Sequence, residues 1–277
     1  MKTTVGKTRA TKTKSANAER GARRATKAVA NKTSGKRAVS TVSAGRSKVA
    51  AQKVKDKSWG WTLFNQLVLI FAIGCIFGTY YEELICLVRN LIETGNVILV
   101  SRRGLVYGPF SPIYGIGAVG IYLIFYRTKA KWPVCLLGGA LLGGMFEYGA
   151  SVVQELIFGT RSWDYTGQLG SIGGRTTVPY MLVWGLLALL AARWLYPLLE
   201  KAYDRMAGRR MNRICVALAV FLVFDATISI AAMWRQAERR AGDTADNAVE
   251  EFLDEEFPDS KLQLIYDNTV YVKKDEG

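Results

Sequence analysis

Five long apolar runs follow one another along the chain, each close to the ~20 residues that a helix needs to cross the hydrocarbon core of a bilayer. The first two runs contain no charged residue, and each of the other three contains one or two. Buried helices of a soluble bundle would not all be so long and so poor in charge. The pattern predicts an all-α, polytopic transmembrane helix bundle within residues 58–234. Its expected spans cover residues 61–81, 105–126, 132–158, 178–199 and 214–234.

Two polar tails flank this apolar region, and their charges are opposite. Residues 1–57 carry a net charge of +15 and contain no aromatic residue, so they cannot bury enough apolar surface to fold. We expect a disordered, basic tail there. Residues 235–277 carry a net charge of −6. They are expected to be a weakly ordered acidic tail, in which two short apolar runs around Asp267 and Asn268 suggest a β-hairpin.

The Lys and Arg residues outside the spans indicate the orientation. The basic tail, residues 127–131 and residues 201–213 fall on one side of a five-span topology, and Lys/Arg-rich segments stay in the cytoplasm. We therefore expect a multi-pass membrane protein with its N-terminus in the cytoplasm and its C-terminal tail outside. Three arginines directly after the last span count against that position of the C-terminal tail: Arg235, Arg239 and Arg240.

The basic tail has two candidate partners besides the lipid bilayer that surrounds the spans. Lys and Arg beside a span are attracted to anionic lipid by about 1 kcal/mol for each residue near the surface. Nucleic acid is the alternative, since counterion release needs no defined fold. Because the tail has no aromatic residue on which a base could stack, such binding would not distinguish sequences. We favour anionic lipid on electrostatic grounds.

Composition excludes several kinds of chemistry. The chain has no His, so neither a Ser-His-Asp machine nor an imidazole-bound metal is possible. Its four cysteines do not have the spacing of metal ligands. We expect no catalytic residues, no metal and no cofactor.

Ionisable residues at membrane depth are costly and therefore indicate a partner or a cavity. In the third span Glu147 and Glu155 lie on one helical face. Asp225 lies near the middle of the fifth span, where a structural ion pair and a functional charge are equally plausible. Gly74 with Gly78, and Gly139 with Gly143, form two GxxxG pairs that favour close helix contacts.

Two outer segments bring further charged and aromatic residues to the same side. Gly and Pro around Pro109 and Pro112 prevent a regular helix before Pro112, so an irregular or re-entrant start of the second span is expected. The other segment is the loop 159–177. Together they predict a salt-bridge lock or a binding site for a polar ligand. The candidate residues are Glu82, Arg102, Arg103, Tyr107, Glu147, Glu155, Arg161, Trp163, Asp164 and Arg175.

Several short motifs in this region carry a family resemblance. They are Gly78-x-x-x-Glu82, the run RGLVYGPFSPIYG at 103–115, Glu147-Tyr148, Phe158-Gly159, Trp163-Asp164-Tyr165, Gly174-Arg175 and Trp184-Gly185. In their order and spacing, residues 71–199 resemble a family of bacterial polytopic membrane proteins, the ABC-transporter permeases of a type IV kind. The resemblance implies a multi-spanning inner-membrane protein with a role in transport.

ATP hydrolysis must come from another chain, because the sequence has no GxxxxGK[ST] phosphate loop. The leading interpretation is therefore a permease-like subunit that moves a polar or charged ligand with a separate ATPase subunit, and that is not itself an enzyme. Two alternatives remain. One is a membrane-embedded enzyme acting on a lipid-linked substrate, and the other is a membrane scaffold whose basic tail binds lipid or nucleic acid. A homo-oligomer is a further possible assembly.

Overall fold

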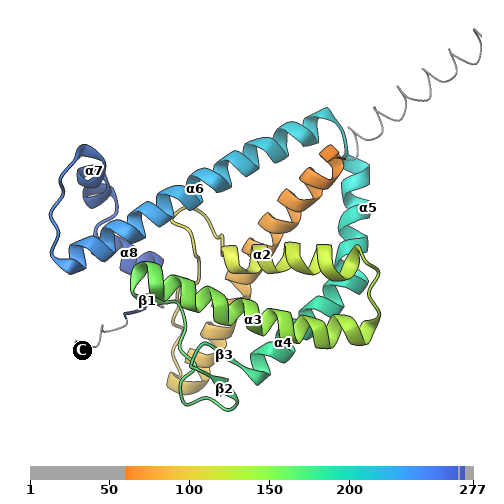
Figure 1. The fold of residues 1–277 in the computed structure, drawn as a ribbon, viewed down its shortest axis with the longest axis horizontal. Helices are drawn as coiled ribbons and strands as arrows, with labels where there is room; N and C mark the ends of the chain where they lie inside the picture. Colours follow the sequence, from red (N-terminus) through yellow and green to blue (C-terminus); the bar gives the residue numbers. More distant parts are fainter. Residues whose placement is uncertain (1–59, 268, 272–277) are drawn as a thin grey trace, which may run out of the picture. The chain divides into compact units, whose positions relative to one another are not determined.

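The computed structural model describes residues 60–267 and 269–271. The expected disordered tail, residues 1–57, lies outside them. Four described helices are long and apolar enough to cross a membrane, and a shorter apolar helix accompanies them (Figure 1). The protein is thus a helical, multi-pass membrane protein. The long helices are Gly60–Thr94, α3 (Trp132–Phe158), the continuous helix Val178–Met206 and α6 (Arg209–Ala241); the shorter one is Pro112–Tyr126.

Two of these helices contain a wider turn. The short helix consists of α2 (Pro112–Ile121) and a π-helical turn, η1 (Tyr122–Tyr126). The helix Val178–Met206 joins α4 (Val178–Leu190), a second π-helical turn, η2 (Ala191–Leu195), and α5 (Tyr196–Met206).

The second span starts later than its apolar run. The expected helix over 105–126 begins only at Pro112, which occupies the first helical turn. Before it the chain turns tightly: Gly108 has φ +67°, and the N–H groups of Gly104 and Leu105 both donate to the carbonyl of Phe110, at 2.8 and 3.1 Å. Proline lacks an N–H and clashes with the preceding helical turn, so seven apolar residues cannot join the helix.

Short strands tie the segments at one end of the bundle. β2 (Ser171–Ile172) pairs with β3 (Thr176–Thr177), and β1 (Thr160–Arg161) pairs with β4 (Val270–Tyr271), both antiparallel. The two apolar runs around Asp267 and Asn268 do not form the hairpin that their pattern resembles. The first run belongs to α8 (Asp259–Ile265), and the second contains β4, whose partner lies more than a hundred residues away.

Glycines let α3 and α4 lie against each other. A Cβ atom added at Gly139 would lie 2.5 Å from the Cβ of Ala188, and one added at Gly143 2.3 Å from the Cβ of Trp184. From the other helix, a Cβ at Gly185 would lie 2.2 Å from the backbone oxygen of Leu136. The close contact predicted from the second GxxxG pair is therefore present.

The first GxxxG pair makes a similar contact with α2. A Cβ at Gly74 would lie 2.7 Å from the Cβ of Ala118, and one at Gly78 2.0 Å from the Cγ of Tyr114. The ring of Tyr114 therefore lies directly on the backbone of the helix Gly60–Thr94.

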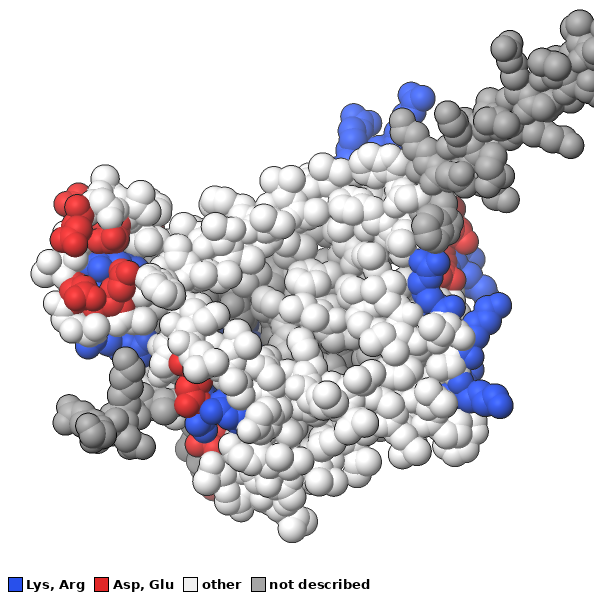
Figure 2. Space-filling model, in the orientation of Figure 1, with Lys and Arg blue, Asp and Glu red and all other residues white. Residues whose placement is uncertain are grey.

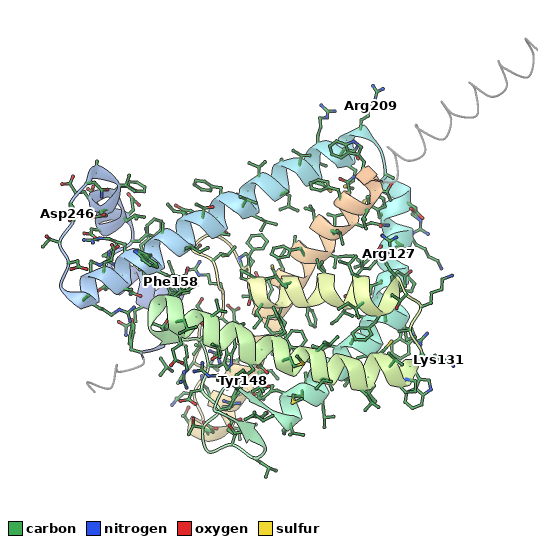
Figure 3. The ribbon with its side chains drawn as sticks, viewed as in Figure 1. Arg127, Lys131, Tyr148, Phe158, Arg209 and Asp246 are labelled. Carbon is green, nitrogen blue, oxygen red and sulfur yellow. The ribbon has the colours of Figure 1, made fainter. Side chains whose placement is uncertain are left out.

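Charged residues gather at the two ends of the bundle and leave its middle apolar (Figure 2). Arg127, Lys131 and Arg209 mark one end, while Phe158 and Asp246 mark the other (Figure 3). The first end is rich in Lys and Arg, and the second mixes both signs. Residues 159–177 and the chain after α6 both lie at the mixed end, where β1 pairs with β4.

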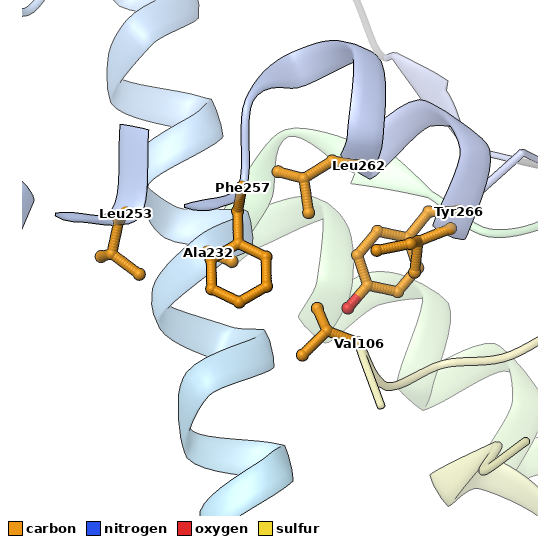
Figure 4. Close-up of a cluster of buried hydrophobic side chains, with 7 residues drawn as sticks. Val106, Ala232, Leu253, Phe257, Leu262 and Tyr266 are labelled. Atoms are coloured by element: carbon orange, nitrogen blue, oxygen red, sulfur yellow. The ribbon is translucent and has the colours of Figure 1, made fainter. Parts of the chain in front are cut away.

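The chain after α6 packs back onto that helix. α7 (Ala248–Glu256) and α8 bury Leu253, Phe257 and Leu262 against Ala232 of α6 and Val106 of the irregular segment (Figure 4). A charged contact adds to this apolar cluster.

The charged contact joins α6 to α7. Arg235 is only 2% exposed and donates two hydrogen bonds of 2.9 Å to the carboxylate of Asp254. Arg239 donates to Asp254 as well, at 2.5 Å. These two arginines hold the pKa of Asp254 at about 2, well below its usual range, because hydrogen bonds and positive charge favour the ionised carboxylate.

Adding one methyl group at the contact of α3 with α4 tests how tightly these helices pack. We expect Gly185→Ala to destabilise the fold by roughly 1–3 kcal/mol, because the new Cβ overlaps backbone that cannot rotate away. Thermal unfolding of the purified protein in detergent measures the change. Gly149→Ala in α3 is the matched control, since a Cβ there meets no atom within 4 Å. Equal melting temperatures for Gly185→Ala and wild type would contradict the described contact.

The low pKa of Asp254 predicts how docking of α7 depends on pH. A carboxyl with a lowered pKa stabilises the fold above its unfolded value of about 4, and loses this contribution as the pH falls towards about 2. We therefore expect hydrogen exchange of the α7 amides, corrected for its intrinsic rate, to be unchanged between pH 7 and 5 and to accelerate below about pH 4. Asp254→Asn should show the faster exchange at every pH. Loss of protection already between pH 6 and 5 would argue against this ion pair.

Candidate functional site

A cavity of about 350 Å³ lies at the mixed-charge end of the bundle. It is enclosed by the helix Gly60–Thr94, α2, α3, α4 and the loop that follows β1. Five of the candidate residues line it: Glu82, Arg102, Glu147, Trp163 and Asp164. Aromatic residues provide much of the remaining wall, namely Tyr81, Tyr114, Tyr165, Tyr180 and Trp184.

Glu82 is held from two sides. Its Oε1 atom accepts a hydrogen bond of 2.7 Å from the hydroxyl of Tyr114, and its Oε2 atom lies 3.6 Å from Nε of Arg102. The close approach at Gly78 makes the hydrogen bond with Tyr114 possible. Gly78 precedes Glu82 by four residues, one helical turn, and the Tyr114 ring lies against Gly78. Glu82 therefore already has one positively charged neighbour.

Glu147 has no such neighbour. Its two carboxylate oxygens accept hydrogen bonds from neutral hydroxyls, Tyr165 at 3.0 Å and Thr176 at 2.7 Å. The residue is 6% exposed, and none of the described Lys or Arg residues forms an ion pair with it. Burial and the adjacent carboxylate raise the pKa of the Tyr165 phenol, so this hydroxyl stays protonated and keeps donating. Glu147 thus faces the cavity with its charge uncompensated by the described part of the chain.

Asp164 is fixed within its loop. Its Oδ1 atom accepts hydrogen bonds from the backbone N–H and the hydroxyl of Thr166, at 2.8 and 2.6 Å. These two bonds lower the pKa of Asp164, which keeps it ionised. Gly174 passes so close that an added Cβ would lie 2.9 Å from this oxygen, and its φ of +70° also favours glycine.

Three further candidates form a separate lock beside the cavity. Glu155 Oε2 accepts from Nε of Arg161 at 2.5 Å and from Nη2 of Arg175 at 2.6 Å. Arg175 also donates to Ser151, while its carbonyl accepts a 2.7 Å bond from the indole of Trp163. The lock fastens the segment after α3 to that helix, and in it one carboxylate pairs with two guanidinium groups.

Arg103 and Tyr107 do not join the cavity. The segment before α2 lies against α6, where Asp225 is fully buried. Asp225 Oδ1 accepts the backbone N–H of Tyr107 at 3.1 Å, and the hydroxyl of Ser229 accepts that of Val106 at 2.9 Å. Arg103 supplies the positive charge that acts on Asp225. Asp225 therefore serves to hold the irregular segment in place.

The sequence-based list lacks several residues that line the cavity. It contains neither the tyrosines that hold the two glutamates, Tyr114 and Tyr165, nor the aromatic residues Tyr180 and Trp184. Tyr114, Tyr165 and Trp184 stand within the motifs that carry the family resemblance, so the signal for three of the four was present in the sequence.

The comparison with protein families identifies the chain. A family model described as "Putative ABC-transporter type IV" matches residues 69–230, which is more than half of the chain, and the protein belongs to this family. The matched region contains Glu82, Glu147 and the loop between β1 and β3, and it ends before α7. No curated protein and no solved structure matches the chain.

Removing the shared carboxylate tests the lock beside the cavity. We expect Glu155→Gln to destabilise the protein by roughly 1–2 kcal/mol, because two arginines lose a charged acceptor. Trypsin should then cut faster after Arg161 and Arg175, and the apparent melting temperature should fall. Glu93→Gln, at an exposed position of the first described helix, is the control. Unchanged cleavage at both arginines would show that the segment is held by other contacts.

Proposed function

We propose that the protein is the membrane-spanning permease subunit of an ABC-type transporter, and that it binds a polar or charged ligand in the cavity at Glu147. The buried, uncompensated carboxylate of Glu147 is the observation that carries this proposal. An ionisable group at membrane depth is costly, and in transporters such groups lie on the path of the substrate or ion. Its family membership supports a role in transport.

The orientation in the inner membrane is part of the proposal. Arg127, Lys131 and Arg209 share one end of the bundle, and the Lys/Arg bias of the flanking segments favours the cytoplasm for this end (Figure 3). The N-terminus would then be cytoplasmic, and the cavity would open at the outer side. Binding of the N-terminal residues 1–57 to anionic lipid agrees with that orientation.

The ATPase subunit would bind at the basic end, because it is a cytoplasmic protein. Residues 127–131 and the turn between α5 and α6 are the connections available there. Arg209 and Arg210 are exposed at the start of α6 and suit an acidic surface on the partner. The chain itself is proposed to have no hydrolytic activity.

Purification of the tagged protein from its native host in mild detergent tests the proposal. Mass spectrometry should find an ATP-binding subunit in stoichiometric amount, and the eluate should show orthovanadate-sensitive ATP hydrolysis. Arg209→Glu with Arg210→Glu should reduce the co-purified subunit about tenfold or more, by placing like charges across the interface.

The matched control reverses a charge at the other end. Lys261→Glu, in the exposed part of α8, should leave the amount of ATPase subunit unchanged. A homo-oligomer without any ATPase would overturn the permease proposal.

A further inference from the structure

We infer that the ligand is an amphiphile, with a cationic head that occupies the cavity at Glu147 and an alkyl tail that lies in an apolar groove beside it. This inference rests on the proposed function and specifies its substrate class. Three observations carry it: the cavity and the groove share three lining residues, the walls of the two differ in polarity, and Glu147 forms no ion pair with the described Lys and Arg residues.

The groove has a volume of about 490 Å³ and lies between the first described helix, α2 and the helix Val178–Met206. Tyr114, Trp184 and Leu187 line both the groove and the cavity. The rings of Tyr114 and Trp184 stack at this boundary, with centroids 5.6 Å apart. The cavity and the groove are therefore neighbours, and an amphiphile that occupies both passes this pair of rings.

The groove suits an alkyl tail. No charged residue lines it, and its wall consists of apolar and aromatic side chains with one glycine. Along the helix it runs from Trp184 to Leu199, which is roughly 22 Å at 1.5 Å per residue. An alkyl tail finds this wall as apolar as the bilayer, so the tail alone gains little by leaving the lipid. The head of the molecule therefore decides whether it binds there.

The cavity favours a positive head. Glu147 is the strongest reason, because a buried carboxyl that forms no ion pair with the described Lys and Arg residues is a ready partner for a cation that enters the cavity. The lining contains three carboxylates and two arginines, and one of these arginines, Arg102, already faces Glu82. The aromatic rings of the wall add cation–π attraction, which quaternary ammonium groups exploit.

Tail-directed photolabelling distinguishes this site from ordinary contact with lipid. The full-length protein in lipid nanodiscs is irradiated with a dodecyl chain that carries a diazirine near its end and a trimethylammonium head. A second probe has the same tail and a sulfate head. We expect the cationic probe to label residues 187–199 about tenfold more than the sulfate probe does, the ratio that one buried charge interaction supplies.

Three variants test the parts of the site. Glu147→Gln should lower labelling by the cationic probe to the level of the sulfate probe. Ile73→Trp fills the groove and should reduce labelling there several-fold, whereas Ile124→Trp fills a different apolar groove, of about 220 Å³, and should change nothing. Thermal unfolding of each variant shows whether it is folded, and the comparison of two probes on wild type needs no variant.

The outcomes separate this inference from the proposed function. Equal labelling by both probes, or labelling that ignores Ile73→Trp, would overturn the cationic amphiphile. A different outcome would make tetramethylammonium alone the better ligand, and it has two signs: tetramethylammonium quenches tryptophan fluorescence in wild type but not in Glu147→Gln, and the dodecyl tail labels no preferred groove. The ligand is then a small cation and the inferred amphiphile is wrong, whereas the proposed ligand cavity stands. The permease role fails separately, by the absence of an ATPase subunit.

Discussion

The close contact of α3 with α4 is the interaction on which the candidate site depends. Gly185 lies against the backbone of Leu136, and this contact sets the distance between the two helices. Glu147 belongs to α3, whereas Thr176 lies two residues before α4 and donates to Glu147 at 2.7 Å. A separation of the helices would stretch this bond, so the packing of the glycines also positions Glu147.

A second constraint comes from the backbone of the irregular segment before α2. Peptide groups that leave a helix at membrane depth must find partners within the protein. Asp225 and Ser229 of α6 provide two of these partners, for the N–H groups of Tyr107 and Val106. The cost of burying Asp225 is offset by this anchoring and by the charge of Arg103, which explains an acidic residue in the middle of an apolar helix.

The sequence predicts the spans and the glycine contacts well, because both depend on local patterns of composition and spacing. It predicts the partners of the charged residues poorly. Glu147 and Glu155 share a helical face, yet one binds hydroxyls in the cavity and the other binds two arginines beside it. Arg102 and Arg103 are neighbours in the irregular segment before α2. Arg102 pairs with Glu82, whereas Arg103 acts on Asp225 through its charge, a division that depends on tertiary packing.

The arginines after α6 show how folding changes the meaning of a charge pattern. By number alone, Arg235, Arg239 and Arg240 count against an outer position for the C-terminal helices. In the fold, Arg235 pairs with Asp254, Glu238 and Glu250, and Arg239 pairs with Asp254 and Asp259. Arg240 lies over the ring of Tyr271 with its guanidinium 4.3 Å from the centroid. The exposed arginines at the start of α6 belong to the other end. The contrast in unpaired Lys and Arg between the two ends is therefore larger in the folded protein than in the sequence, which supports the proposed orientation and agrees with the proposal that an ATPase subunit binds the basic end.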